Sequence, residues 1–238
     1  MITRSQIKFI RNLRFKKHRI KHQCFVVEGE KIVSELLSSN FEIIELYAVD
    51  QWICIDKKLV VNYISNNQLQ SISTLKSPNK VLAIVKNPDL GIIKNTNITL
   101  VLDSIRDPGN LGTIIRVCDW FSVNKIVCSL DTTDVFSPKV IQATMGSIFR
   151  VHLQYLDLEE YFKKIDEPIY GAFIEGQNIK NVKIEEKAHL VLGNESNGIS
   201  KPIANLINNR ISIFKKGKNI DSLNVAIATG IMLHEFSC

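Results

Sequence analysis

Three short stretches in the second half of the chain carry polar side chains where an apolar run ends. They are 107–116 (DPGNLGTIIR), 192–198 (LGNESNG) and 222–225 (SLNV). Each places Gly, Asn or Ser where a strand is expected to give way to a helix, and open α/β sheets bind ligands at such carboxyl ends of strands. Asn, Ser, Glu and Arg at these points could orient a hydroxyl group and bind an anion. The three stretches together therefore predict one built site.

The first stretch offers Asn110 and Arg116. Gly109 and Gly112 flank Asn110 and would let a ligand approach the backbone closely. No G-x-G-x-x-G pattern and no P-loop lysine are present, so a nucleotide phosphate cradle is not favoured. Arg116 interrupts an apolar run, and a buried guanidinium needs a partner. That partner is either an acidic residue of the same chain or a phosphate of a bound RNA, which an arginine fork can hold through two oxygens.

The other two stretches offer an acid and an amide. Glu195 directly follows an expected strand and could orient Asn110 or pair with Arg116, although a solvated loop acid is the alternative. Ser222 is expected to be the N-cap of the last helix. Asn224 is expected in the first turn of that helix, where capping does not explain it.

The elements expected to position these residues form an α/β domain. From Ile98 the strands are continuous apolar runs, as in parallel strands covered on both faces, and the pattern alone predicts a doubly wound sheet. The expected strands are Ile98–Asp103, Lys125–Leu130, Ile148–Val151, Ile169–Ile174, Ala188–Leu192 and Ile211–Phe214. The expected helices are 110–121, Ser137–Met145, Leu158–Ile165, one opening near Ile199–Pro202, and Ser222–Phe236.

The first ninety residues predict a second, smaller α/β module. It begins with a basic amphipathic helix over 3–15 and continues with strands and helices at Phe25–Glu28, Lys31–Ser38, Phe41–Val49, Lys58–Ile64, Asn67–Leu75 and Val81–Lys86. A linker-like composition places the boundary between about 88 and 97. The expected domains are therefore 1–90 and 97–238.

Charge is concentrated at the start of the chain. The 238 residues carry a net charge of +6, yet residues 1–22 contain eight Lys and Arg and no acid, which leaves the remainder at −2. Such a patch on a nearly neutral body is typical of a polyanion partner, although a solvated helix face would look the same. The cations expected to contact RNA phosphates are Arg4, Lys8, Arg11, Arg14, Lys16, Lys17 and Arg19.

Composition narrows the class of protein further. The five cysteines form no C-x-x-C pair, which favours reduced thiols and a cytoplasmic location. No apolar run approaches the roughly 18 residues that a membrane span requires. His18 and His22 lie four apart, but no third ligand is near, so no metal site is expected.

In order and spacing, the three stretches resemble the signature motifs of the SPOUT-class RNA 2′-O-ribose methyltransferases, SpoU/TrmH branch, over about 98–236. The segment 139–150 (KVIQATMGSIFR) is similar to that family's sequence between its first two motifs. The segment 25–29 (FVVEG), after the basic helix, resembles the ribosomal-protein-like substrate-binding domain that many of these enzymes carry. Phe214 stands where the family commonly has Pro, and the loop that follows is one residue longer.

The resemblance implies a trefoil-knotted α/β (SPOUT) domain, S-adenosylmethionine as cofactor, and a homodimer whose sites are completed across the interface. Its RNA substrate would be ribosomal, with transfer RNA second. The family's catalytic positions correspond to Asn110, Arg116, Glu195, Ser222 and Asn224. Its cofactor-binding positions correspond to Leu192, Gly193, Asn194, Gly198, Ile213 and Leu223.

Two other classes of protein remain as alternatives. A non-catalytic RNA-binding protein that retains the fold would bind RNA without S-adenosylmethionine, but it would have no use for the full polar set. A nicotinamide-dependent oxidoreductase would need a glycine fingerprint that the chain lacks, and it would leave the basic segment 1–22 unexplained.

Overall fold

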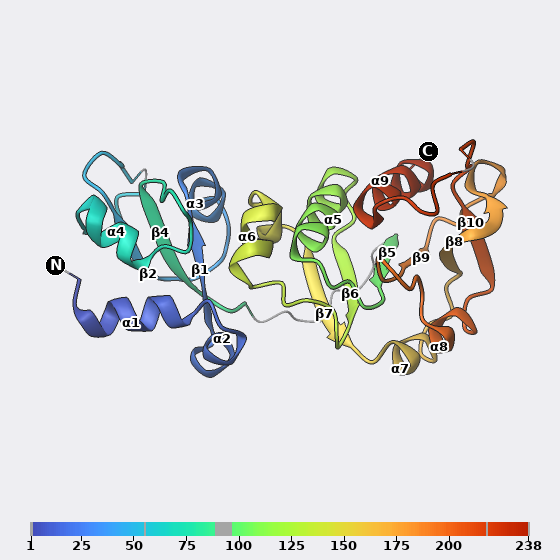
Figure 1. Ribbon diagram of the computed structural model, residues 1–238, viewed down its shortest axis with the longest axis horizontal. Coiled ribbons are helices and arrows are strands. Elements are labelled where there is room, and N and C mark those ends of the chain that lie inside the picture. Colours follow the sequence, from blue (N-terminus) through green and yellow to red (C-terminus); the bar gives the residue numbers. More distant parts are fainter. Residues whose placement is uncertain (1, 55, 89–96, 218, 238) are drawn as a thin grey trace. The chain divides into compact units, whose positions relative to one another are not determined.

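The computed structural model describes residues 2–54, 56–88, 97–217 and 219–237. Contacts between residues divide the chain into two compact units (Figure 1). Unit 1 comprises Met1–Asp89 and Asp134–Phe149, and unit 2 comprises Leu90–Thr133 and Arg150–Cys238. The boundary expected between 88 and 97 falls almost entirely outside the described residues. The domain limits 1–90 and 97–238 therefore remain a prediction.

Unit 1 is built on a sheet with strand order β1-β4-β2-β3. Strand β4 pairs antiparallel with β1 and β2, whereas β3 pairs parallel with β2. Edge strand β1 and central strand β4 are almost wholly buried, as their continuous apolar sequences predict. The elements of this unit are α1 (Arg4–Asn12), α2 (Lys16–His22), β1 (Cys24–Glu28), α3 (Glu30–Leu37), β2 (Ile43–Ala48), β3 (Val61–Tyr63), α4 (Asn66–Ile72), β4 (Val81–Lys86), α6 (Pro138–Thr144) and η1 (Ser147–Phe149).

The basic segment does not form the single helix expected over 3–15. Helix α1 ends at Asn12, and α2 begins at Lys16 after an extended residue, Phe15. Thr3 caps α1 through a capping box with Gln6. The guanidinium of Arg19 donates to the carbonyl of Leu13 at 2.7 Å, at the turn between the two helices. Sequence periodicity missed this break because the turn contains neither Gly nor Pro.

Residues 134–149 make their contacts with the strands of unit 1, although sequence reasoning placed them in the second domain. Arg19 forms an ion pair with Asp134, and the ring of Phe136 stacks on that of Phe25 with centroids 4.5 Å apart. The side chain of Gln142 also donates to the carbonyl of Glu28 at 2.8 Å. The segment 134–149, which lies between β6 and β7 of unit 2 in sequence, is therefore part of unit 1.

Unit 2 is built on a parallel sheet with strand order β10-β8-β9-β5-β6-β7. This confirms the parallel α/β architecture expected from the apolar runs. Figure 1 shows α5 and α9 on one face of the sheet and α7 and α8 on the other. The elements are β5 (Ile98–Leu102), α5 (Pro108–Trp120), β6 (Lys125–Ser129), β7 (His152–Leu156), α7 (Leu158–Phe162), β8 (Ile169–Asn178), η2 (Ile179–Asn181), β9 (Ala188–Leu192), α8 (Lys201–Ala204), β10 (Asn209–Ser212) and α9 (Val225–Phe236).

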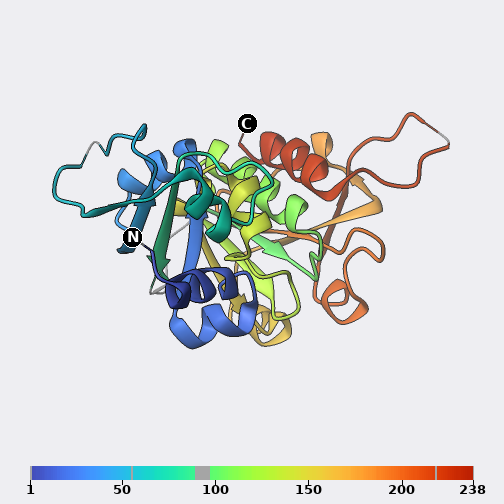
Figure 2. The same ribbon diagram turned by 60° about the vertical axis from the view of Figure 1, so that its left-hand side comes forward.

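The core of this unit follows the strand register. Val101 pairs with Val127 on one side and Val191 on the other. All three valines belong to a buried cluster that includes Leu158 of α7 and Ile203 of α8. On the opposite face, α5 packs against α9, as both views of the ribbon show (Figures 1 and 2).

Two expected boundaries in the second half were wrong. The strand expected at Ile148–Val151 is instead the short helix η1, and β7 begins at His152. The last helix begins at Val225 rather than Ser222, with Asn224 as its N-cap. Figure 2 shows the connection between β10 and α9 running out from the sheet. Within the described residues, no helix is long and apolar enough to cross a membrane.

Candidate active site

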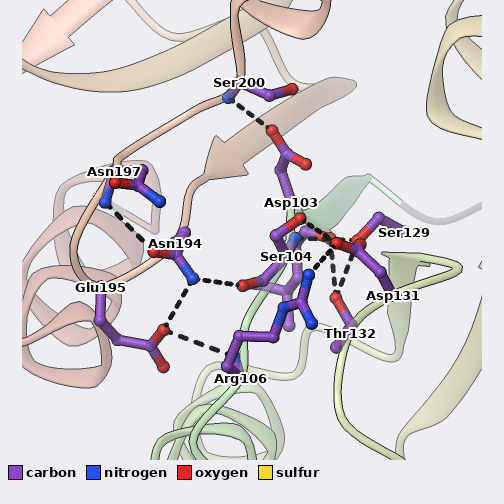
Figure 3. Close-up of polar contacts among 11 residues, drawn as sticks. Asp103, Ser104, Arg106, Ser129, Asp131, Thr132, Asn194, Glu195, Asn197 and Ser200 are labelled. Atoms are coloured by element: carbon purple, nitrogen blue, oxygen red, sulfur yellow. Dashed lines mark hydrogen bonds and ion pairs between the residues drawn. The ribbon is translucent and has the colours of Figure 1, made fainter.

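The first two polar stretches meet because β5 and β9 are neighbouring parallel strands. Leu102 at the end of β5 pairs with Leu192 at the end of β9, so the loops that follow leave the sheet at the same edge. The backbone N–H of Asp103 donates to the carbonyl of Leu192 at 2.9 Å. The Asp103 carboxylate accepts a hydrogen bond from the backbone of Ser200 at 2.7 Å (Figure 3). Strand pairing thus brings residues about ninety positions apart into one polar cluster.

Glu195 is the acceptor at the centre of this cluster. Its Oε1 accepts from the side-chain amide of Asn110 at 3.0 Å and from the backbone of Asp107 at 3.2 Å. Its Oε2 accepts from the backbone of Arg106 at 3.4 Å and from Asn194 at 3.3 Å. Partial burial disfavours the charged form, but the hydrogen bonds outweigh it and hold the pKa of Glu195 below its ordinary value. The carboxylate is therefore ionised at neutral pH and acts as an acceptor only.

Asn110 links the first stretch to the third. Its backbone N–H donates to Asp107, which caps α5, at 2.8 Å. Its side-chain Nδ2 donates to Glu195, so its Oδ1 must point the other way, and there it accepts from Nδ2 of Asn224 at 2.9 Å. An ionised carboxylate cannot donate, and this fixes the orientation of the Asn110 amide.

Asn224 has a second role that sequence reasoning assigned to Ser222. Its Oδ1 accepts from the backbone of Ala226 at 2.9 Å and of Ile227 at 3.4 Å, which makes it the N-cap of α9. The expectation that Ser222 caps this helix was wrong. Ser222 lies two positions before the N-cap and is exposed. One asparagine therefore both begins α9 and holds Asn110.

The loop after β9 is a tight turn held by Asn194. Its Nδ2 donates to the carbonyl of Ser104 at 2.8 Å, and its Oδ1 accepts from the backbone of Ser196 and Asn197 at 3.0 and 3.1 Å (Figure 3). Gly198 has a φ of +67°, which favours glycine. A Cβ on Gly193 would lie 2.1 Å from the backbone of Gly198. The two glycines therefore allow this turn to close.

A second acidic group beside the site escaped the sequence reasoning. Asp131, just after β6, accepts from the hydroxyls of Ser104 and Ser129 and from the guanidinium of Arg106, each at 2.6 Å (Figure 3). Its burial is outweighed by these contacts, which lower its pKa. Strand β6 neighbours β5 in the sheet. The sequence signal that could have identified Asp131 is a polar residue directly after an apolar strand, as in the other stretches of the site.

Arg116 is not brought into this cluster. It lies six residues beyond Asn110 on α5, on an exposed face that it shares with Thr113 and Trp120. No ion pair joins its guanidinium to another described residue. Arg116 is exposed rather than buried, because positions 109, 113, 116 and 120 form the solvent face of this helix. Of the two partners expected for it, an acidic residue of the same chain is not found among the described residues, and an RNA phosphate stays a prediction.

The remaining expected cofactor positions border the same edge of the sheet. Leu192 is buried and offers only its backbone, whereas Ile213 is half-buried and Leu223 is exposed. Gly193, Asn194 and Gly198 form the turn described above. These residues present apolar surface and turn backbone, as expected for a site that receives an uncharged ring through contact rather than through ion pairs.

In unit 1, most cations of the basic segment are exposed, with one exception. Arg19 is 3% exposed and is paired with Asp134, so its expected role in contacting phosphate was wrong. Its guanidinium instead stabilises the turn after α1, where it binds the carbonyl of Leu13 and the carboxylate of Asp134. The exposed cations are Arg4, Lys8, Arg11, Arg14, Lys16, Lys17 and Lys21. Within the described residues, no group of three or more metal-binding side chains is present.

Two family models match this chain. Residues 97–234 match the SpoU rRNA Methylase family, and residues 4–83 match the MRM3-like substrate binding domain. Among relatives, the Bacillus subtilis 23S rRNA (guanosine(2553)-2'-O)-methyltransferase RlmP is 25% identical over 96% of this chain and 94% of its own length. The mitochondrial rRNA methyltransferase 3 of Xenopus tropicalis is 32% identical over 57% of this chain and 36% of its own.

Solved structures of similar proteins extend over the whole chain. A TrmH-family protein from Porphyromonas gingivalis superimposes with a TM-score of 0.90 and 37% identity, covering 99% of this chain and 98% of its own. The AdoMet-bound rRNA methyltransferase from Sinorhizobium meliloti has a TM-score of 0.85 and 29% identity, over 99% and 95%. These matches confirm the predicted SPOUT fold class and the accessory substrate-binding domain. The chain belongs to the SpoU rRNA methylase family.

Proposed function

We propose that this protein transfers a methyl group from S-adenosylmethionine to a ribose 2′-hydroxyl of ribosomal RNA. The observation that carries this proposal is the continuous hydrogen-bonded chain Glu195–Asn110–Asn224, which joins three turns distant in sequence. A fold retained only for RNA binding has no need of such a chain. The relatives support the substrate, since RlmP is named for 2′-O-methylation of 23S rRNA.

Ribosomal RNA is favoured over transfer RNA by the first unit. Residues 4–83 match a substrate-binding domain named after a mitochondrial type of methyltransferase, and the Xenopus relative is an rRNA methyltransferase. Transfer RNA is the second candidate substrate. We place the protein in the cytoplasm, where bacterial ribosomal RNA is found and where the free thiols of Cys24, Cys54, Cys118 and Cys128 would stay reduced.

S-adenosylmethionine fits the residues at the edge of the sheet. Gly193 and Asn194 would contact it through the turn backbone, and Ile213 and Leu223 through apolar side chains. Bound there, S-adenosylmethionine supplies an electrophilic methyl group on a sulfonium centre, so the transfer needs no metal. Phe214 and Ile220 of the same connection are also exposed apolar side chains, which suits a surface that covers an adenine ring.

The polar chain would orient the acceptor ribose. Asn110 is held by Glu195 on one side and by Asn224 on the other, so its amide cannot rotate. Ser222, close to Asn224 in sequence, can accept or donate a hydrogen bond to the sugar. Holding a hydroxyl in line for transfer can supply several kcal/mol of the barrier.

Arg116 would bind the phosphate next to the target and stabilise the developing alkoxide. A guanidinium keeps its proton up to about pH 12 and does not serve as a general base. The proton of the 2′-hydroxyl would therefore leave to solvent. The exposed and unpaired state of Arg116 supports this role, since a side chain that only stabilised the helix would be paired within the chain.

A homodimer would complete the site. Within unit 2, the exposed surface of α5 and α9 carries large apolar side chains, among them Trp120 at 83% and Ile227 at 56% exposure. Exposed apolar surface of this kind marks an interaction site. Arg116 lies between Thr113 and Trp120 on the same face of α5. If a second copy covers that face, Arg116 of one protomer would lie in the active site of the other.

Titration calorimetry and a methylation assay test the proposal together. The protein should bind S-adenosylmethionine and not a nicotinamide cofactor, and it should transfer radiolabelled methyl to ribosomal RNA. Binding of RNA without S-adenosylmethionine would indicate the non-catalytic alternative. Binding of the nicotinamide would indicate an oxidoreductase.

A further inference from the structure

We propose that the surface of α1 and α2 binds an unpaired nucleobase of the RNA by stacking, in addition to contacting phosphates. The proposal rests on the function above, since it assumes an RNA substrate. It concerns four rings, which we term the ring ladder: Phe9, His22, His18 and Phe15. Helices α1 and α2 lie next to each other in both views of the ribbon, where they are dark blue (Figures 1 and 2).

The rings form a continuous series. Phe9 meets His22 edge to face with centroids 5.0 Å apart. The rings of His22 and His18 are parallel to within 7° at 6.3 Å, and His18 lies 6.4 Å from Phe15. The guanidinium of Arg14 lies 4.6 Å from the centroid of Phe15 and continues the series with a cation. Nucleobases stack on surfaces of this composition.

Two rings of the ring ladder, Phe15 and His22, are exposed, whereas Phe9 and His18 are half-buried and Phe9 packs against the core. Ile10 and Leu13 are each 1% exposed and belong to the core, whereas Phe15 is 45% exposed and His22 is also exposed. Phe15 is the extended N-cap residue of α2, and its ring is not part of the core cluster of this unit. An exposed aromatic ring beside a guanidinium is a common feature of RNA contacts.

The charges around the ring ladder favour a polyanionic partner, and His18 itself is uncharged. Lys16, Lys17 and Lys21 are exposed near the rings, and no acid lies within residues 1–22. Partial burial lowers the pKa of His18, and the positive charges of Lys17, His22 and Lys21 lower it further. His18 is therefore an uncharged aromatic ring at neutral pH. The lysines attract the phosphate backbone of the RNA, while the exposed rings remain available to a nucleobase.

Arg19 holds this surface in place. It donates to the carbonyl of Leu13 at the end of α1 and forms an ion pair with Asp134, and its side chain is 4% exposed. The only buried cation among residues 4–22 in the described structure thus fixes the angle between the two helices. A surface fixed before binding loses little conformational entropy on binding.

Stacking distinguishes unpaired from paired RNA. In a duplex the faces of the bases are covered by their neighbours, and sequence-specific proteins use unpaired bases for this reason. Phosphate contacts, by contrast, occur with both forms. The ring ladder therefore predicts a preference of unit 1 for a loop, a bulge or a single strand near the modified nucleotide.

Binding of the full-length protein to two RNAs tests this inference. One is an unstructured RNA of about 12 nucleotides, and the other is the duplex of the same sequence. Phe15→Leu and His22→Gln should each weaken binding to the unpaired RNA about tenfold and leave duplex binding unchanged. Because Phe15→Leu removes no cation, the slope of log affinity against log salt should stay the same for this variant.

Two control variants separate stacking from other effects. Ile20→Ala removes a side chain of α2 that is 56% exposed but is not a ring, and it should change neither affinity. Lys17→Gln should weaken binding to both RNAs and reduce the salt slope by roughly one phosphate contact. Unchanged circular dichroism and thermal midpoint would show that each variant is folded.

An equal loss on both RNAs, or no loss on either, would overturn the inference. If wild-type protein also methylates ribosomal RNA, the proposed function stands while the ring ladder is rejected. If wild-type protein neither binds RNA nor methylates it, both proposals fall.

Discussion

Asn224 donates its side-chain amide to Oδ1 of Asn110 at 2.9 Å, across 114 positions of sequence. The same side chain accepts two backbone hydrogen bonds at the start of α9. Helix capping and orientation of the site are thus combined in one residue. Its two functions use different atoms, Oδ1 for the cap and Nδ2 for Asn110, so they can be separated by substitution.

Asn224→Asp should keep the cap and lose the link to Asn110. A carboxylate accepts from the helix backbone as well as an amide does, but it cannot donate to Asn110 Oδ1 and would repel it. We expect a thermal midpoint close to that of the wild type and a fall in kcat of about tenfold or more. Asn224→Ala, which loses both functions, should in addition be less stable by about 1 kcal/mol. Equal activity of the Asp variant and the wild type would contradict this account of Asn224.

Glu195→Gln tests the acceptor at the centre of the site. The carboxylate receives four donors, whereas a glutamine has one oxygen and presents an NH2 group to donors that it cannot satisfy. Hydrogen bonds to a charged group are worth about 1.5–3 kcal/mol. We expect kcat to fall roughly ten- to a hundredfold, with the affinity for S-adenosylmethionine changed much less.

The depressed pKa of Glu195 gives a matching prediction for pH. The stability that the ionised Glu195 carboxylate contributes to the folded protein is present above the ordinary pKa of this group. It is lost only as pH falls through the lower pKa of the folded state. The activity of wild-type protein should therefore show no titration of this carboxyl between pH 6 and 8. A loss of activity as pH falls from 8 to 6 that disappears in Glu195→Gln would argue that Glu195 itself takes the proton.

Arg116→Lys should abolish most methylation while leaving the cofactor site intact. The lysine keeps the charge but loses the two-pronged donor geometry that fits a phosphate. Because Arg116 is exposed and unpaired among the described residues, the stability of the protein should not change. We expect a fall in kcat of at least about tenfold at unchanged affinity for S-adenosylmethionine. Turnover near that of the wild type would refute the role assigned to Arg116.

Trp120→Glu should separate the proposed dimer. Trp120 is 83% exposed on α5, and a charge at that position would be buried without a partner in a dimer. Sedimentation velocity should show a monomer for the variant and a dimer for the wild type, with methylation lost together with the dimer. A wild type that sediments as an active monomer would contradict the proposal of shared sites.

His189 should make the stability of unit 2 sensitive to acid. Burial lowers its pKa from 6.5 to about 4, with Glu167 opposing and Lys125 reinforcing the shift. Below pH 6.5, His189 is protonated in the unfolded chain but stays neutral in the folded chain, so stability falls as pH drops from 6.5 towards 4. Between pH 7 and 5 the free energy of unfolding should fall by about 2 kcal/mol from this group.

Urea unfolding of His189→Gln at the two pH values checks this. The amide does not titrate, so this part of the loss should disappear while other titrations remain in both proteins. An identical fall in the variant and the wild type would show that His189 does not contribute.

Sequence reasoning was successful where an apolar strand ended in a polar turn. The strands that precede Asp103 and Gly193 were evident as continuous apolar runs, and the parallel sheet followed from them. The register that pairs Leu102 with Leu192 then brings Asn110 and Glu195 together. The convergence of these side chains could thus be anticipated from local sequence and the rule for ligand sites in α/β sheets.

Features that depend on tertiary contacts were not accessible. Asp131 acquires significance only because β6 neighbours β5, and strand order is not encoded in local periodicity. Arg19 resembles its neighbouring cations in sequence, and only its contact with Asp134 buries it. Asn224 rather than Ser222 is the N-cap. Both residue types are good N-caps and the two stand only two positions apart, so propensity alone does not decide between them.

The most direct test of the central claim is to map 2′-O-methylated nucleotides in unmodified ribosomal RNA after incubation with the protein and S-adenosylmethionine. Resistance of the modified linkage to alkaline cleavage locates the methyl group. We predict one protected position with wild-type protein and none with folded Asn110→Ala, which removes the middle of the chain from Glu195 to Asn224. A methyl group on a base, or equal protection by the variant, would contradict the account.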